Sequence, residues 1–180
     1  MALSSAVLVI DLQIGLVALA PGADELLDRV GHVLARARAA HVPVVHVQHS
    51  HATYAPLMAG APTWRIHPRV APFDTETVIS KTASDAFYKT SLLDELTRLG
   101  VSRLIVAGMQ TEYCVDTTCR RALSLGFDVT LVSDGHTTCD GVLPAADVVR
   151  HHNTVLAGLA HPDHRVAVVP SRDITFEVHP

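Results

Sequence analysis

Asp11, Lys81 and Cys114 each come at or shortly after the end of an apolar run that favours a β-strand. In an open parallel sheet the carboxyl ends of the strands meet at one edge, where ligands bind. A carboxylate, an ammonium and a thiol gathered there are suited to nucleophilic catalysis, with sulfur attacking and the carboxylate moving the proton. Each residue alone has an ordinary interpretation, as a strand end, a surface charge or a small buried side chain. The functional interpretation therefore depends on their convergence.

Cys114 has the strongest individual signal of the three. Residues 108–118 join an apolar strand to a helix-like pattern, so the cysteine falls at the start of a helix. Unpaired N–H groups and the helix dipole favour an anion there. We therefore predict that the helix start and Lys81 lower the pKa of the thiol, and that Lys81 also depresses the pKa of Asp11. Cys119, on the apolar stripe of the helix, and Cys139, in a loop, lack this context.

The elements that must position these side chains alternate between strands and helices. Apolar runs predict strands at residues 6–10, 42–47, 77–80, 103–107, 127–132 and 165–169. Helical spacing of apolar residues is clearest at 26–37, 91–99, 115–125 and 144–159. This alternation predicts an α/β protein with three α/β/α layers, in which helices cover both faces of a six-stranded, mainly parallel sheet. We expect residues 1–180 to form a single domain.

The strand order 3-2-1-4-5-6 would bring the three reactive groups to one crevice. Strands 1 and 4 are then neighbours at the switch point, which places Asp11 and Cys114 within contact range. Strand 3 lies two places from strand 1, roughly 9–10 Å away at about 4.8 Å per step. The long stem of Lys81 covers most of that gap, which a short side chain could not do.

Residues 49–76 interrupt the alternation. The segment is punctuated by prolines, lacks clear periodicity and contains the single tryptophan, Trp64. A loop of this length within a compact domain usually serves as a lid or an interface. We expect Trp64, Ile66 and Phe73 to be buried, which argues against a disordered insert.

Composition argues against several classes of partner. The chain of 180 residues is 48% hydrophobic and 18% charged, with a formal net charge of −4 and no basic run, so we expect no nucleic-acid partner. We also expect no membrane partner, because no apolar stretch approaches the roughly 18 residues that cross a bilayer. We see no signal-peptide pattern. Three cysteines suggest no disulfide framework and favour a reduced, cytoplasmic setting.

The histidines near position 49 suggest a metal site without completing one. His46, His49 and His51 lie close in sequence, but no aspartate lies nearby to extend the ligand set. We therefore expect neither a metal nor another cofactor, and interpret these histidines as pocket-lining or surface residues. Dinucleotide, P-loop and serine-hydrolase motifs are absent.

Several segments resemble the isochorismatase-like cysteine hydrolases, in order and over most of the chain. They are Asp11-Leu12-Gln13, Trp64-Arg65-Ile66-His67-Pro68, Lys81 with Asp85-Ala86-Phe87, Gly108 to Thr118, Ser133 to Thr138, and His151-His152-Asn153. The resemblance implies a six-stranded α/β/α fold and a catalytic triad of Asp11, Lys81 and Cys114. It also implies a cis peptide bond between Met109 and Gln110, and an oxyanion hole built from the backbone N–H groups of Gln110 and Cys114. The pocket walls implied by position in these motifs are Leu16, His49, Trp64, Phe87 and Tyr113.

The resemblance further implies hydrolysis of a C–N bond in a small carboxamide-type substrate through an acyl-enzyme thioester. The family is usually oligomeric, so we expect a dimer or tetramer. Two alternatives remain open: a vinyl-ether hydrolase of the isochorismatase type, and a catalytically silent binding protein on the same scaffold. His49-Ser50-His51 stands where related nicotinamidases carry the Asp-x-His of a metal site, so the resemblance extends neither to that metal nor to nicotinamide.

Overall fold

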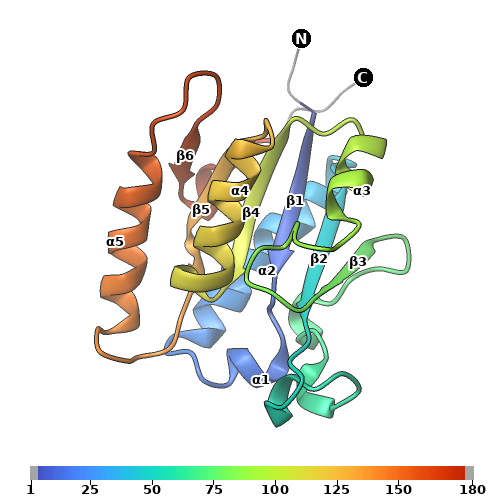
Figure 1. Ribbon diagram of the computed structural model, residues 1–180, viewed down its shortest axis with the longest axis vertical. Helices are drawn as coiled ribbons and strands as arrows, with labels where there is room; N and C mark the ends of the chain where they lie inside the picture. The colour runs from blue at the N-terminus through green and yellow to red at the C-terminus, as the bar shows by residue number, and fades with distance from the viewer. Residues whose placement is uncertain (1–3, 177–180) are drawn as a thin grey trace.

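A six-stranded sheet forms the centre of the computed structural model, which describes residues 4–176 (Figure 1). The strands are β1 (Ser5–Ile10), β2 (Val44–His49), β3 (Thr77–Lys81), β4 (Arg103–Met109), β5 (Asp128–Thr137) and β6 (Val166–Val169). Their order is β3-β2-β1-β4-β5-β6, and each neighbouring pair is parallel. The predicted α/β class, parallel sheet and strand order are confirmed.

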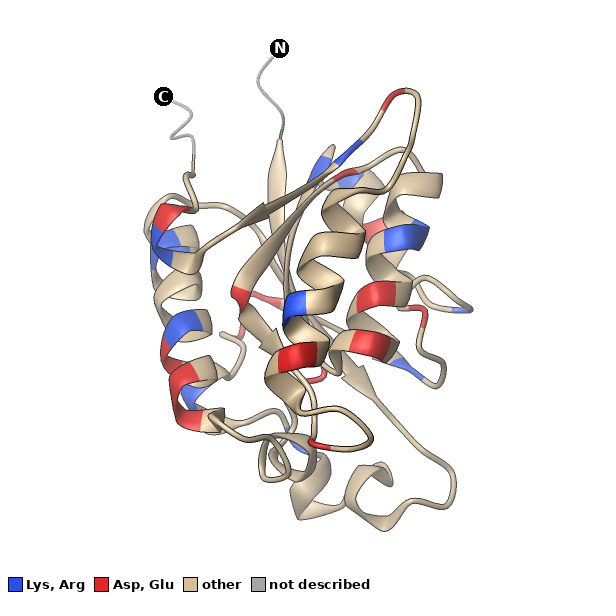
Figure 2. Ribbon diagram, turned by 90° about the vertical axis from the view of Figure 1, so that its left-hand side faces the viewer, with Lys and Arg blue, Asp and Glu red and all other residues tan. Residues whose placement is uncertain are grey.

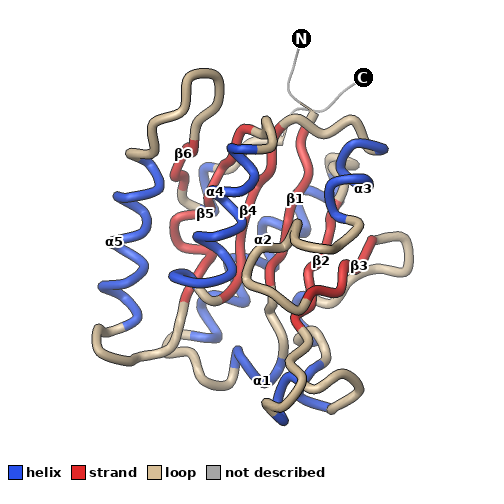
Figure 3. Tube along the Cα trace, viewed as in Figure 1, coloured by secondary structure: helices blue, strands red, loops and turns tan. Residues whose placement is uncertain are grey.

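Helices cover both faces of the sheet, and several of them carry charged residues, as the side view of Figure 2 shows. They are α1 (Ile14–Val17), α2 (Ala23–Ala39), α3 (Leu92–Arg98), α4 (Asp116–Ser124) and α5 (Ala145–Ala157). The buried side chains of α3, α4 and α5 join one core, whereas those of α1 and α2 join the other. Figure 3 shows the resulting layers, with the strands between the two sets of helices.

Alternation along β1 explains why the sheet has two cores. Ala6, Leu8 and Ile10 face α3, α4 and α5, whereas Val7 and Val9 face α2, and all five are almost completely buried. A strand with two buried faces reads as a continuous apolar run, which is the pattern that predicted it. Each fully buried aliphatic side chain contributes about 1.5–3 kcal/mol of transfer free energy.

Two features differ from the sequence predictions. β5 continues to Thr137, because His136 and Thr137 pair with the end of β4 although they are polar. Residues 49–76 fold into three short 3-10 helices, Ala55–Leu57, Pro62–Trp64 and Pro68–Val70. The predicted burial of Phe73 is wrong, since the residue is 57% exposed and the centroid of its ring lies 3.8 Å from the guanidinium carbon of Arg38. That cation–π contact stabilises an aromatic ring at the surface.

Within residues 4–176, none of the helices combines the length and the apolar character that crossing a membrane requires.

Gly108 allows β4 to approach β1 just before the segment that carries Cys114. Its φ angle is +133°, and a Cβ atom there would lie 2.0 Å from the carbonyl oxygen of Ile10. Only glycine avoids that overlap while adopting this backbone conformation. The positions of the chain after β1 and after β4 therefore depend on one residue that has no side chain.

We expect Gly108→Ala to lower the free energy of unfolding by at least about 3 kcal/mol or to prevent folding, because backbone must move to admit the methyl group. Gly141→Ala is the matched control, since a Cβ there meets nothing within 4 Å. Urea unfolding of both variants measures the difference. Stability of Gly108→Ala equal to that of Gly141→Ala would contradict the packing argument.

Candidate active site

Asp11, Lys81 and Cys114 meet at the carboxyl edge of the sheet. Lys81 ends β3, Asp11 follows β1, and Cys114 lies in the π-helical turn Thr111–Val115 between β4 and α4. The Nζ atom of Lys81 lies 2.7 Å from Oδ2 of Asp11 and 3.1 Å from Sγ of Cys114. The lysine stem thus spans the two strand positions between β3 and β1. The structure brings together the three residues that the sequence singled out.

Lys81 is a buried ammonium surrounded by acceptors. Its side chain is 0% exposed. Besides Asp11 and Cys114, Nζ contacts the carbonyl oxygen of Ala83 at 3.0 Å and Nδ1 of His49 at 3.2 Å. Burial alone would lower the pKa of Lys81, but the charges and hydrogen bonds of Asp11 and Cys114 outweigh it and raise the pKa. Lys81 therefore remains protonated and supplies a fixed positive charge.

Asp11 is completely buried beside this cation. Desolvation raises the pKa of its carboxyl, and the opposing effect of Lys81 does not cancel the rise, so the predicted depression is wrong. Besides Lys81, the thiol of Cys114 and the backbone of His49 are hydrogen-bonding neighbours of this carboxyl. A buried carboxylate with a raised pKa beside a thiol is well suited to accept its proton.

The backbone of Asp11 is held in an unusual conformation. Its φ angle of +51° lies in the left-handed region, which few residues other than glycine adopt. Its N–H donates to the carbonyl of Val47 at 3.0 Å, and its carbonyl accepts from the N–H of Gln13 at 2.8 Å. Backbone strain of this kind persists where the surroundings enforce it, commonly at functional sites.

The pKa of Cys114 is raised to about 11, so the predicted lowering of this pKa is also wrong. Burial of the sulfur is the main cause, and the negative charge of Asp11 adds to it, while Lys81 opposes both. The cysteine also lies in the π-helical turn that precedes α4 rather than at the first residue of α4 itself. Near neutral pH the resting residue is a thiol, so proton loss must accompany attack on a substrate.

Polar side chains tie the turn that carries Cys114 to the end of β5 and the loop after it. The pairs are Gln110 with Cys139 at 3.1 Å, Thr111 with His136 at 2.9 Å, and Glu112 with Thr138 at 2.8 Å. His136 also contacts Asn153 of α5 at 2.9 Å through its other ring nitrogen. Burial lowers the pKa of His136 to about 4, so this bridge is uncharged near neutral pH. The resemblance pointed to these segments without assigning them this positioning role.

The peptide bond between Met109 and Gln110 is cis, at the place where the resemblance implies such a bond. Gln110 and Cys114 both line the cavity in front of the sulfur. That the backbone N–H groups of Gln110 and Cys114 form an oxyanion hole remains a prediction.

A cavity of about 640 Å³ opens in front of Cys114. Of the predicted wall residues, Leu16, His49 and Tyr113 line it. Trp64 and Phe87 do not, so those two assignments are corrected. His51, expected to line a pocket or lie at the surface, also lines the cavity, and the wall residues that were not predicted are Leu19, Thr53, Tyr54, Leu57 and Ser84. Most of them come from the segment after β2. That segment has no helical or strand periodicity from which the direction of its side chains could be predicted.

Packing explains why the two aromatic residues lie elsewhere. Phe87 is 9% exposed and stacks on Phe127 in the core at a centroid distance of 6.1 Å. The indole N–H of Trp64 donates to Oγ of Ser50 at 3.0 Å. Neither ring therefore forms part of the cavity wall.

Gln13 joins the segment after β1 to the segment after β2. Its buried side-chain amide donates to the carbonyls of His49 at 3.0 Å and Trp64 at 2.7 Å, and accepts from the N–H of His49 at 2.9 Å. Gln48 donates a further hydrogen bond to the carbonyl of Trp64 at 2.9 Å. These amides hold the wall of the cavity against the residues that follow β1.

Histidines beside the cavity do not assemble a metal site in the part of the chain that the structure describes. No group of three or more His, Cys, Asp and Glu side chains there is arranged to hold an ion. His49 instead directs Nδ1 at the ammonium of Lys81.

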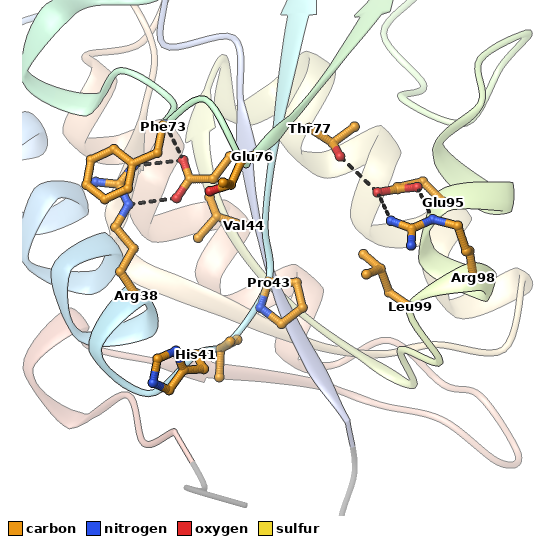
Figure 4. Close-up of a pocket in the computed structure, with 12 residues that line it drawn as sticks. Arg38, His41, Pro43, Val44, Phe73, Glu76, Thr77, Glu95, Arg98 and Leu99 are labelled. Carbon is orange, nitrogen blue, oxygen red and sulfur yellow. Dashed lines mark hydrogen bonds and ion pairs between the residues drawn. The ribbon is translucent and has the colours of Figure 1, made fainter.

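Figure 4 shows a second cavity, of about 300 Å³, at the amino-terminal end of β2 and β3. Arg38 and Glu76 form two hydrogen bonds of 2.7 and 2.8 Å there, and Arg98 and Glu95 form two of 2.8 Å. Each guanidinium is thus satisfied by its own carboxylate. The reactive groups lie at the opposite end of the strands, the carboxyl end.

Comparisons with known proteins agree with this geometry. A family model described as an isochorismatase domain matches residues 5–169. A solved structure of an isochorismatase family protein is 34% identical, with a TM-score of 0.80, and the match covers 91% of this chain and 97% of that one. The likeness therefore extends over nearly the whole fold.

Several relatives carry names that state an activity. A streptothricin hydrolase from Streptomyces noursei is 42% identical over 144 residues, which are 78% of this chain and 51% of the relative. The chain thus spans about half the length of the streptothricin hydrolases it matches. A nicotinamidase from Escherichia coli (strain K12) is 46% identical over 54 residues, which are 30% of this chain and 24% of that protein.

We expect Lys81→Met to lower the free energy of unfolding by about 3–5 kcal/mol, because it leaves the Asp11 carboxylate buried without its counter-charge. The double variant Asp11→Asn/Lys81→Met should lose less than this single variant. Lys89→Met, at an exposed lysine, should stay within about 0.5 kcal/mol of the parent protein. Urea unfolding measures all three, and a double variant less stable than Lys81→Met would contradict a stabilising ion pair.

The alkylation rate of Cys114 by iodoacetamide should keep rising from about pH 7 to about pH 10, because its pKa is raised to about 11 and the thiolate is the reactive form. Asp11→Asn should move this profile to lower pH, since the charge of Asp11 raises the pKa of the thiol. Mass spectrometry of the Cys114 peptide separates this residue from the other two cysteines. A rate that levels off below about pH 8 in the parent protein would contradict the assigned protonation state.

Proposed function

The chain belongs to the isochorismatase family, and from that premise we propose that it is a cysteine-dependent hydrolase that cleaves the C–N bond of a small carboxamide. The observation that carries the proposal is the contact of one ammonium with both a thiol and a carboxylate at 3.1 and 2.7 Å. The names of the streptothricin hydrolase and the nicotinamidase among the relatives support hydrolysis of such a bond.

In the first half of the proposed reaction, Sγ of Cys114 attacks the carbonyl carbon of the substrate. The thiol proton passes to Asp11, whose raised pKa and hydrogen bond with Cys114 suit it to the transfer. The C–N bond then breaks as Asp11 returns the proton to the leaving nitrogen. The products are free ammonia or amine and an acyl group held as a thioester on Cys114.

In the second half, water replaces the leaving amine. Asp11 takes a proton from the water as its oxygen attacks the thioester, and the proton returns to the sulfur when the acid leaves. Lys81 stays protonated throughout and offsets negative charge on the sulfur and the carboxylate. The backbone N–H groups of Gln110 and Cys114 are the proposed oxyanion donors. Removal of one such donor typically costs about 3–4 kcal/mol of transition-state stabilisation.

The proposal predicts that the protein releases ammonia from one or more members of a panel of small carboxamides, and that Cys114→Ala abolishes the release. Cys119→Ala is the matched control, because it removes a thiol that is buried in the core on α4. Acid quenching followed by mass spectrometry should show an acyl adduct on the Cys114 peptide. Ammonia release that survives Cys114→Ala would refute the covalent mechanism, and turnover of a vinyl ether instead of amides would favour the alternative hydrolase.

A further inference from the structure

The cavity walls come mainly from two segments of the chain that lack charged residues. Residues 12–23 and 49–64 contain no Asp, Glu, Lys or Arg, although 18% of the chain is charged. The first segment contributes Leu16 and Leu19 to the cavity, and the second contributes His49, His51, Thr53, Tyr54 and Leu57. Figure 2 shows the contrast: charges mark the helices, whereas the loops at the bottom of the view have few.

The remaining wall adds no net charge. It consists of Asp11, Ser84, Gln110, Tyr113 and Cys114. The charge of Asp11 is compensated by Lys81 at 2.7 Å. Glu112 lies in the same turn as Tyr113 and Cys114, but it does not line the cavity and accepts a hydrogen bond from Thr138.

His49 is uncharged near neutral pH, and one ring nitrogen of His51 is engaged by backbone donors. Burial and the nearby cation of Lys81 lower the pKa of His49 to about 4. The backbone N–H groups of Thr53 and Tyr54 donate to Nδ1 of His51 at 3.2 and 2.9 Å. Nδ1 of His51 therefore acts as the acceptor in both hydrogen bonds.

We propose that the cavity selects uncharged amides whose acyl group is aliphatic or aromatic, and discriminates against amides that carry a carboxylate or an ammonium on that group. The inference rests on the proposed function, since it concerns the substrate of the same site. Leu16 and Leu57 are the buried apolar contacts, and Leu19, Tyr54 and Tyr113 form a partly exposed rim. An ionised group placed here would lose water without gaining a partner of opposite charge, which is strongly unfavourable.

The volume of the cavity agrees with this class of ligand. A cavity of about 640 Å³ lies within the range of sites that enclose a ring-bearing small molecule. Aromatic and aliphatic side chains are the usual lining of such sites, with a few polar groups that fix orientation. Ser84 and Gln110 are polar wall residues of that kind.

A matched series of para-substituted benzamides tests the inference directly. The 4-methyl compound is neutral, the 4-carboxy compound is an anion and the 4-aminomethyl compound is a cation. We expect kcat/KM for ammonia release to be at least about tenfold higher for the neutral compound than for either ion, because an ion enters the cavity unpaired. Equal or faster turnover of either ionised compound would overturn the proposal.

A charge placed on the wall should change this selectivity. Leu19 lines the cavity and is 53% exposed, so Leu19→Arg can fold with its guanidinium near the ligand. It should raise the ratio of kcat/KM for the 4-carboxy compound over the 4-methyl compound by about tenfold. Leu143→Arg is the matched control, at a residue that is 54% exposed and outside the cavity wall. An unchanged ratio in Leu19→Arg, or an equal change in both variants, would overturn the assignment of these walls.

Failure of the proposed chemistry can be told apart from failure of this inference. If the parent protein releases no ammonia from any of the three compounds, calorimetry of Cys114→Ser with the same compounds measures binding alone. Tighter binding of the neutral compound than of both ions supports the selectivity without the chemistry. Equal or tighter binding of an ion, or no binding of any compound, overturns it.

Discussion

The buried ion pair between Lys81 and Asp11 is the interaction on which the rest of the site depends. Two full charges with no solvent exposure are tolerable only because they lie 2.7 Å apart and the ammonium has further acceptors around it. The strand order provides the separation that a lysine stem can bridge. Close approach of β4 to β1 at Gly108 then brings Cys114 to the same cation. The arrangement of the strands and the position of the reactive groups are therefore both tied to this ion pair.

Burial and the neighbouring charges shift the pKa values of the three groups and so set their different protonation states. Burial raises the pKa of Asp11 and of Cys114 alike, so the carboxylate becomes a better base while the sulfur keeps its proton at rest. Lys81 is the exception, because the charges beside it outweigh its own burial. In the proposed mechanism the thiol of Cys114 therefore starts beside an acceptor for its own proton.

Much of the architecture could be predicted from the sequence, because strands with two buried faces appear as continuous apolar runs, as in β1 and β4. The convergence of Asp11, Lys81 and Cys114 followed from their places at strand ends. The pKa directions of Asp11 and Cys114 could not be predicted, since they depend on how completely water is excluded. Phe87 and Trp64 were misplaced because an aromatic side chain near a motif can pack behind a site as readily as line it. Thr53, Tyr54 and Leu57 were missed because the segment after β2 follows no helical or strand period.

The way Gln13 and Gln48 hold that segment has a consequence for how such a protein can diverge. The amide of Gln13 contacts main-chain atoms of His49 and Trp64, and the amide of Gln48 contacts the carbonyl of Trp64. Such hydrogen bonds do not depend on which side chains occupy the positions whose main-chain atoms they contact. Substitutions along the segment can therefore remodel ligand preference while the reactive centre stays in register, so new specificities can evolve without rebuilding the catalytic apparatus.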